Sequence, residues 1–284
     1  MTMYWRTLIR VDELARHLDD CVVVDCRHDL TDPGYGPAAW ARAHLPGAFF
    51  LHQDHDLAGP RTGANGRHPL PDRETLRRTL ESIGLADGRQ LVAYDETGGM
   101  MASRLWWLSR WLGHAEVAVL DGGLPAWREA GHALTTEPPS PRAPATLTLR
   151  PPRTAQVDAA QLLAQLGTDR LRIVDARTPE RWRGEVEPLD PVAGRIPGAL
   201  NRPYTENLQP DGRFKTPQAL RAEFLALLDG RPASAVVHQC GSGVTACHNL
   251  LAMEVAGLPG AMLYPGSWSE WCADPARPIA VGDD

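Results

Sequence analysis

The chain has 284 residues, of which 43% are hydrophobic and 23% are charged, and its formal net charge is −6. This length and composition indicate one large or two ordinary globular domains rather than a disordered or fibrous chain. The acidic balance argues against nucleic acid as a partner, and no apolar run has the length of a membrane span.

The first half of the chain alternates helical and strand patterns. Helical spacing over 11–18 precedes the apolar run Cys21–Asp25, which is typical of a buried strand. Further short strands are expected over 91–94 and 117–120, on either side of a helix over 102–112. Such alternation predicts an α/β domain with a mostly parallel sheet flanked by helices.

The second half repeats this order. An apolar run ends at Asp175 as the earlier one ends at Asp25, and a Pro-Gly-Ala motif follows each, 21 residues after Asp25 and 22 after Asp175. Glu96 precedes Trp127 by 31 positions, and Cys240 precedes Trp271 by the same number. We therefore expect a duplicated domain in which Glu96 stands at the position of Cys240.

Prolines mark the boundary between the two copies. They cluster between 138 and 152, and they cannot continue a helix or a central strand. We predict a noncatalytic domain over 1–136, an extended linker over 137–153 and a catalytic domain over 154–284.

The stretch around Cys240 carries the clearest chemical signal. A short strand over 235–237 leads into a loop with two glycines, and a helix follows whose apolar face repeats as Val244, Cys247, Leu251 and Val255, with Gly257 as its cap. Loop amides and the helix N-terminus both stabilise negative charge. A thiol at this place should ionise readily and act as a nucleophile.

Three other protein families use a glycine-rich turn between a strand and a helix, and the sequence departs from the pattern of each. Residues 241–246 match a dinucleotide fingerprint, but no acidic residue lies about 20 positions on. A nucleophile elbow would need glycines two positions either side of Ser242, where Cys240 and Val244 stand. A cysteine phosphatase would need arginine in place of Ala246.

The five cysteines suit a reducing compartment. They are odd in number and unevenly spaced, without a Cys-x2-Cys pair, and residues 1–10 lack the apolar core of a secretory signal. We expect a cytoplasmic protein with thiols, one of them reactive.

The loop Cys-Gly-Ser-Gly-Val-Thr at 240–245, followed by Tyr-Pro-Gly-Ser-Trp at 264–268, resembles the tandem-domain rhodanese sulfurtransferases, especially the mercaptopyruvate type. The resemblance covers nearly the whole chain. It implies two rhodanese-like domains, with the active site at their interface and the reactive cysteine in the second. No metal or organic cofactor is implied.

The resemblance also implies roles for other residues. Arg181 matches the arginine that binds the donor's anionic group, and Asp54, His68 and Ser242 match an Asp–His–Ser arrangement beside the cysteine. The catalytic candidates are Cys240, Ser242 and Arg181. The other candidates for substrate binding are Gly241, Gly243, Val244, Thr245, Arg183, Arg195, His68, Asp54 and Trp268.

One position departs from the family pattern. Mercaptopyruvate enzymes carry a second arginine in a Glu-Pro-Arg triplet, but here the triplet is Glu187-Pro188-Leu189. The uncharged loop favours 3-mercaptopyruvate, whereas Leu189 removes half of the expected carboxylate clamp. Either 3-mercaptopyruvate or thiosulfate therefore stays open as the donor.

The predicted reaction passes a sulfur atom from the anionic donor to Cys240 as a persulfide, and then to cyanide or a thiol such as a thioredoxin-like acceptor. One alternative is a persulfide carrier or sensing module that acts on a protein partner with low turnover alone. Another is a dinucleotide-binding oxidoreductase. Neither nucleic acid nor membrane is expected as a partner.

Overall fold

The computed structural model describes residues 4–140 and 145–283, so part of the predicted linker, 141–144, lies outside the described residues. The chain divides into two compact units. Residues 1–59, 71–153 and 209–214 form the first unit, and residues 60–70, 154–208 and 215–284 form the second. Two short segments, 60–70 and 209–214, are thus grouped differently from the division at 136 and 154 that the sequence suggests.

The first unit contains a five-stranded sheet in the order β1-β5-β4-β2-β3, and all its strand pairs are parallel. Its strands are β1 (Leu8–Ile9), β2 (Cys21–Asp25), β3 (Phe49–Phe50), β4 (Gln90–Tyr94) and β5 (Val117–Leu120). Its helices are α1 (Val11–Arg16), η1 (Leu18–Asp20), α2 (Tyr35–Arg42), α3 (Arg73–Ser82), α4 (Ala102–Trp111) and α5 (Gly123–Glu129).

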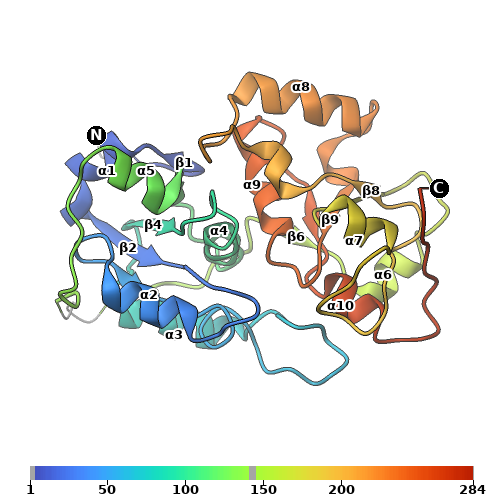
Figure 1. Cartoon of the computed structure of the whole chain (residues 1–284), viewed down its shortest axis with the longest axis horizontal. Helices are drawn as coiled ribbons and strands as arrows, with labels where there is room; N and C mark the ends of the chain where they lie inside the picture. The colour runs from blue at the N-terminus through green and yellow to red at the C-terminus, as the bar shows by residue number, and fades with distance from the viewer. Residues whose placement is uncertain (1–3, 141–144, 284) are drawn as a thin grey trace. The chain divides into compact units, whose positions relative to one another are not determined.

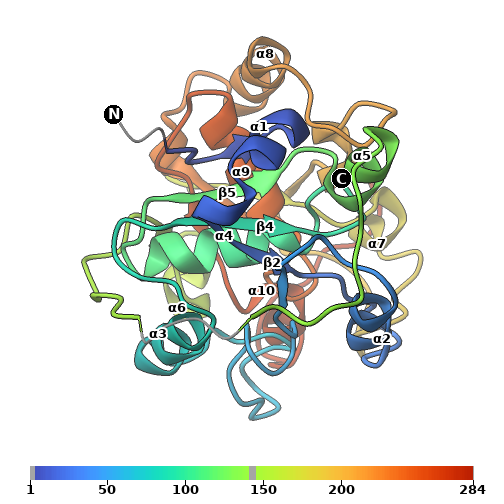
Figure 2. The same cartoon turned by 90° about the vertical axis from the view of Figure 1, so that its left-hand side faces the viewer.

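Helices cover both faces of this sheet, with α1 and α5 on one side and α3 and α4 on the other (Figure 2). Leu14 of α1 and Leu124 and Trp127 of α5 pack on Val23 and Val92 in one buried cluster. The central strands β2 and β4 are buried along their whole length, which explains why they read as continuous apolar runs rather than alternating ones.

The second unit repeats this architecture, with strand order β6-β10-β9-β7-β8 and parallel pairing throughout. Its strands are β6 (Ala155–Gln156), β7 (Arg172–Asp175), β8 (Leu200–Asn201), β9 (Val236–Gln239) and β10 (Met262–Leu263). Its helices are α6 (Ala159–Leu163), α7 (Pro179–Arg183), η2 (Tyr204–Asn207), α8 (Pro217–Leu228), η3 (Ala233–Ala235), α9 (Ala246–Val255) and α10 (Ser267–Trp271).

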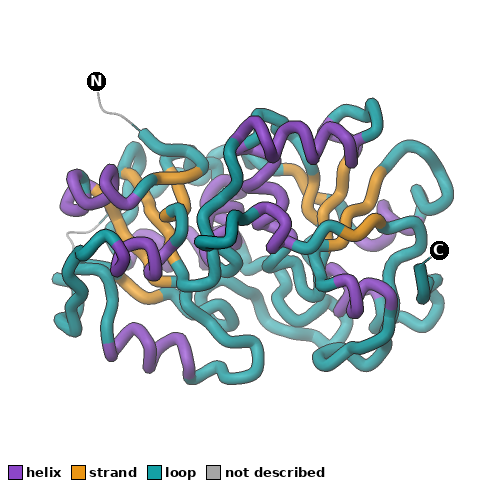
Figure 3. Tube along the Cα trace, turned by 45° about the horizontal axis from the view of Figure 1, so that its top comes forward, coloured by secondary structure: helices purple, strands orange, loops and turns teal. Residues whose placement is uncertain are grey.

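Figure 1 shows the second unit with α8 and α9 on one face of the sheet and α6 and α10 on the other. Leu162 of α6 and Trp268 and Trp271 of α10 form one buried cluster with Val237 of the central strand. Many strands are only two residues long, and loops make up much of the trace between them (Figure 3).

The two sheets have the same order, taken strand by strand along the chain, so the predicted duplication and fold class are confirmed. Both units also keep the same ion pair after the second strand of the repeat, Asp25 with Arg27 at 2.6 Å and Asp175 with Arg177 at 2.7 Å. Within the described residues, no helix is both long enough and apolar enough to cross a bilayer.

Candidate active site

The loop at residues 240–245 joins the end of the central strand β9 to the start of α9. Gly243 has φ +81°, and a methyl group there would lie 2.2 Å from the Pro265 carbonyl oxygen, so only glycine fits. The first turn of α10 supports the loop, because Trp268 N–H donates to the Cys240 carbonyl and Ser269 N–H to the Gly241 carbonyl, both at 2.9 Å. The backbone around Cys240 is therefore held rigidly.

The Cys240 sulfur faces the backbone amides of its own loop. Its Sγ accepts a hydrogen bond from Gly243 N–H at 3.2 Å, and its own N–H donates to Ser267 Oγ at 3.1 Å. The residue is 2% exposed. A negative charge on this sulfur would be stabilised by the N–H dipole of Gly243, as expected of an anion-binding loop.

Two guanidinium groups lie beside this loop, over Gly241. A methyl group placed on Gly241 would be 2.7 Å from Arg67 Nη2 and 3.3 Å from Arg181 Nη2. Arg181 is the arginine predicted from the sequence for this place, whereas Arg67 was not predicted. The only local signal for Arg67 was its position next to His68 in the chain.

Two buried carboxylates position these arginines. Glu187 Oε1 and Oε2 accept from Arg181 Nη2 at 2.6 Å and Nε at 3.2 Å. Asp190 lies 3.1 Å from Arg67 Nε and 3.6 Å from Arg181 Nη2. Burial raises the pKa of the Asp190 carboxyl above its ordinary value, although the neighbouring Arg67 acts in the opposite direction.

Ser242 and His68 are hydrogen-bonded, with 2.7 Å between Ser242 Oγ and His68 Nδ1. Both side chains are buried, at 4% and 3% exposure. The segment 60–70 that carries His68 and Arg67 is part of the second unit, so this pair and the cysteine loop belong to one compact body. Arg67 N–H donates to Ser269 Oγ at 3.0 Å and ties this segment to α10.

The corresponding loop of the first unit corrects the alignment made from spacing. Tyr94 is paired with Asp25 in the sheet as Gln239 is paired with Asp175, so the next residue, Asp95, is the counterpart of Cys240. Glu96 is not. The count failed because the first loop spans 95–101, one residue longer than the loop at 240–245. Glu96 instead bonds the Tyr35 hydroxyl.

The Asp95 carboxylate fills the first loop. It accepts hydrogen bonds from four backbone N–H groups at 2.7–2.9 Å, those of Thr97, Gly99, Met101 and Ala102. The same strand-to-helix frame is thus used in both units. In the first unit four amides surround the protein's own carboxylate, and in the second unit one loop amide donates to the cysteine sulfur.

Three residues predicted to bind substrate make structural contacts instead. Arg183 pairs with Glu185 at 2.7 Å, on the surface. Arg195 is buried, stacks on Trp182 with its guanidinium carbon 4.1 Å from the ring centroid, and bonds the Gly282 carbonyl, so it holds the C-terminal segment. The Trp268 side chain is fully buried in the core cluster rather than in a pocket wall, and it supports the loop through its backbone N–H.

Val244, Thr245 and Asp54 are the remaining predicted binding residues. Val244 is buried and Thr245 occupies the N-cap position of α9, so both belong to the backbone framework of the cysteine loop. The Cys247 thiol donates to the Gly243 carbonyl at 3.3 Å. Asp54 lies in the first unit, with its carboxylate 3.8 Å from His28 Nε2, and its predicted part in an Asp–His–Ser arrangement stays a prediction.

His28, His52 and Asp54 are also close enough together to be considered as metal ligands, within 4.8 Å of one another. Both ring nitrogens of His52 are already engaged, Nε2 with the Pro33 carbonyl and Nδ1 with the Asp54 N–H, each at 3.0 Å. A metal would have to break one of these bonds, so the cluster is better explained as a hydrogen-bonded turn.

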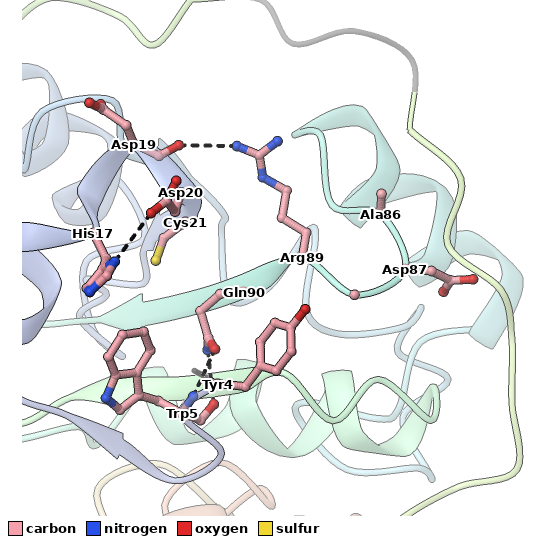
Figure 4. Close-up of a pocket in the computed structure, with 11 residues that line it drawn as sticks. Tyr4, Trp5, His17, Asp19, Asp20, Cys21, Ala86, Asp87, Arg89 and Gln90 are labelled. Atoms are coloured by element: carbon pink, nitrogen blue, oxygen red, sulfur yellow. Dashed lines mark hydrogen bonds and ion pairs between the residues drawn. The ribbon is translucent and has the colours of Figure 1, made fainter. Parts of the chain in front are cut away.

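A cavity of about 860 Å³ in the first unit lies at the opposite ends of the strands (Figure 4). It is lined by Cys21 and Gln90, which begin β2 and β4, and by Trp5, His17 and Arg89. Ligands of parallel sheets bind outside the carboxyl ends of the strands. The cysteine loop lies at a carboxyl end and this cavity does not, so size alone does not identify the active site.

Comparison with known proteins agrees with this geometry. The rhodanese-like domain model matches residues 10–130 and 158–274. A Pseudomonas aeruginosa protein named "Probable 3-mercaptopyruvate sulfurtransferase" is 50% identical over 280 residues, covering 97% of this chain and 98% of the relative. The Bos taurus thiosulfate sulfurtransferase is 34% identical over 235 residues, covering 80% and 77%.

Among solved structures, the crystal structure of SseA from Escherichia coli, described as a 3-mercaptopyruvate sulfotransferase with the rhodanese fold, matches with a TM-score of 0.79 at 30% identity. The match covers 93% of this chain and 99% of that one. Two parallel α/β domains, a cysteine-bearing loop in the second, and these relatives together identify a tandem-domain sulfurtransferase. The chain belongs to the rhodanese family.

Proposed function

We propose that this enzyme takes a sulfur atom from 3-mercaptopyruvate or thiosulfate, holds it as a persulfide on Cys240 and passes it to cyanide or a thiol. The observation that carries the proposal is the meeting of three features at Gly241. They are a cysteine sulfur that accepts a loop amide, the guanidinium groups of Arg67 and Arg181, and a support from α10 that fixes the loop.

In the first step, the Cys240 thiolate attacks the transferable sulfur of the donor, and a new S–S bond forms. With 3-mercaptopyruvate the C–S bond breaks and its electron pair leaves on the enolate of pyruvate, which then takes a proton. With thiosulfate the S–S bond breaks and sulfite leaves with the electron pair. Arg181 and Arg67 hold the anionic end of the donor in this scheme.

The persulfide is an anion, and the loop amides are placed to stabilise it. The four-amide contact of the Asp95 carboxylate supports this role, because it demonstrates how many N–H groups such a loop can direct at one anion. In the second step, the acceptor attacks the outer sulfur and restores the Cys240 thiolate. Two half-reactions through one covalent intermediate predict ping-pong kinetics.

Ser242 and His68 suit a proton relay to the pyruvate enolate. Their 2.7 Å hydrogen bond begins two residues from Cys240, and both groups are shielded from bulk water. Thiosulfate needs no such proton, because sulfite leaves as a stable anion. Ser242→Ala should therefore reduce the rate with 3-mercaptopyruvate more than the rate with thiosulfate.

Arg67 bears on the donor preference that Leu189 left open. It supplies a second guanidinium at Gly241, whereas the triplet Glu187-Pro188-Leu189 lacks the arginine of the family pattern. We therefore expect activity on both donors, with 3-mercaptopyruvate ahead by a modest factor. Because Arg67 already provides this charge, Leu189→Arg should raise the 3-mercaptopyruvate rate only slightly.

The direct test is a pair of initial-rate series with 3-mercaptopyruvate and with thiosulfate, each with cyanide as acceptor. Parallel double-reciprocal lines with both donors would support the scheme. Thiocyanate formation with neither donor would overturn it. The acceptor, cyanide or a thioredoxin-like thiol, and the cytoplasmic location stay predictions from the sequence.

A further inference from the structure

The charges beside the cysteine loop cancel before any donor arrives. Three arginines face three carboxylates in one connected network, Arg67, Arg177 and Arg181 with Asp175, Glu187 and Asp190. A pocket for an anion would ordinarily keep its positive charge unmatched. The carboxylates must therefore differ in how firmly they neutralise the two guanidinium groups at Gly241.

Asp175 and Glu187 each accept several hydrogen bonds. Asp175 accepts from the Arg177 side chain, and Glu187 accepts from Arg177 and Arg181 and also from the backbone N–H groups of Leu189 and Asp190. Contacts of this kind fix a carboxylate as part of the frame. Neither group is placed to exchange partners with a donor.

Asp190 is bound less completely. Its Oδ1 pairs with Arg67 Nε at 3.1 Å, while its buried Oδ2 has only the 3.6 Å ion pair with Arg181 and no hydrogen-bond partner within the part of the chain that the structure describes. Its side chain is 2% exposed, so water cannot screen its charge well. It thus faces the same two guanidinium groups that the donor is proposed to contact.

We propose that Asp190 is a specificity-determining residue, a fixed internal anion that limits how much negative charge the donor can carry. This inference rests on the proposed function. Coulomb repulsion scales with the charge of the incoming group, so Asp190 disfavours a dianion such as thiosulfate twice as much as a monoanion such as 3-mercaptopyruvate. Arginines alone would favour the dianion, and Asp190 offsets that preference.

The test uses Asp190→Asn, which keeps the shape and an acceptor oxygen but removes the charge. Sulfate and acetate serve as inert probes at constant ionic strength and about pH 8, where carboxylates are ionised. Each probe's half-protecting concentration against iodoacetamide labelling of Cys240 is measured by peptide mapping. The control is Glu185→Gln, which neutralises the exposed partner of Arg183.

We expect Asp190→Asn to shift the sulfate-to-acetate selectivity about tenfold toward sulfate, with no shift in the control. Asp190→Ser also removes the charge, should shift the selectivity the same way, and serves if Asp190→Asn does not fold. Equal changes for both probes would show that Asp190 only positions the arginines and would overturn the proposal.

Donor kinetics complete the test. Asp190→Asn should raise kcat/KM for thiosulfate relative to 3-mercaptopyruvate by a similar factor. The probe experiment does not depend on turnover. A wild-type enzyme that forms no persulfide with either donor would refute the proposed function, whereas an unchanged probe selectivity would refute only the role of Asp190.

Discussion

The loops that follow the two central strands, 95–101 in the first unit and 240–245 in the second, begin from the same register and lead into equivalent helices. In the first, the Asp95 carboxylate accepts four backbone amides. In the second, the Cys240 sulfur accepts one, and two arginines lie over the next residue. The frame is shared, and the residue at its centre differs.

The two loops thus use the same backbone arrangement for two different roles. A loop that directs several N–H groups at one point stabilises an anion, whether that anion is structural or chemical. In the first loop, the Asp95 carboxylate already accepts the hydrogen bonds of the loop amides. Cys240 leaves the second loop able to stabilise a charge that changes during a reaction.

The largest effect is expected from Cys240→Ser. A serine hydroxyl does not ionise near neutral pH and forms no stable sulfur-loaded intermediate, so thiocyanate production should fall to background with both donors. Initial rates measure this. Cys247→Ser is the matched control, because Cys247 lies on the following helix and bonds the Gly243 carbonyl; equal loss in the control would contradict the assignment.

In the first unit, Asp95→Ala should lower the free energy of unfolding by about 3 kcal/mol, because four backbone N–H groups, three of them buried, would lose a charged acceptor. Denaturant titration measures the change. Added sulfate should recover part of the loss by entering the emptied loop, while sulfur transfer at Cys240 persists in the folded protein.

Glu96→Gln is the control for Asp95→Ala, since the two residues are adjacent and only Asp95 bonds the loop amides. The half-buried Glu96 pairs with Tyr35 and lies 3.9 Å from Arg27. Its loss should cost about 1 kcal/mol or less. Equal destabilisation by the two variants would mean that the amide contacts of Asp95 contribute no more to stability than the ordinary contacts of Glu96.

Arg181→Ala should raise KM for an anionic donor and reduce kcat/KM by about ten- to a hundredfold, the effect of losing one charge-assisted hydrogen bond of about 1.5–3 kcal/mol. Steady-state kinetics measure it. Arg183→Ala, two residues away and paired with Glu185, should leave the kinetics unchanged. Similar losses in both variants would argue for a general effect of surface charge.

The smallest expected effect is the contribution of His238, in the strand before the cysteine loop, to the pH dependence of stability. Burial lowers the pKa of His238 to about 3, and its counterpart in β4 is Ala93. The unfolded histidine has a pKa of about 6.5, so only the unfolded chain binds this proton between those values. The contribution to stability is complete above about pH 6.5 and declines as pH falls toward 3.

His238 should therefore lower the free energy of unfolding by about 1.4 kcal/mol between about pH 7.5 and 5.5. His238→Ala, which copies Ala93, should remove this part of the pH dependence even if it lowers stability at both pH values. Denaturant titrations at the two pH values decide the matter. The same slope in the variant would show that other groups cause it.

The repeat and the cysteine loop could be predicted from short stretches of the sequence. Parallel central strands are apolar throughout, and the glycines and the helical face around Cys240 lie within one short stretch, so periodicity and turn chemistry suffice to find them. The predicted strand over 117–120 coincides with β5, and the predicted helix over 102–112 differs from α4 by one residue.

Contacts between residues far apart in the chain could not be predicted in this way. Arg67 joins the site only because 60–70 packs with the second unit, and nothing near it in sequence encodes that choice. Arg195 resembled a substrate-binding arginine by type, yet its contacts with Trp182 and Gly282 depend on where the C-terminal segment runs. Asp95 was passed over because spacing cannot reveal a one-residue difference in loop length.

The most direct test of the account is the location of the transferred sulfur. The wild-type protein would be treated with each donor without acceptor, desalted and analysed by intact-mass spectrometry and peptide mapping. The account predicts one added sulfur atom per chain, on Cys240, and its loss on addition of cyanide. Sulfur on Cys247 or Cys272, or no added mass with either donor, would contradict it.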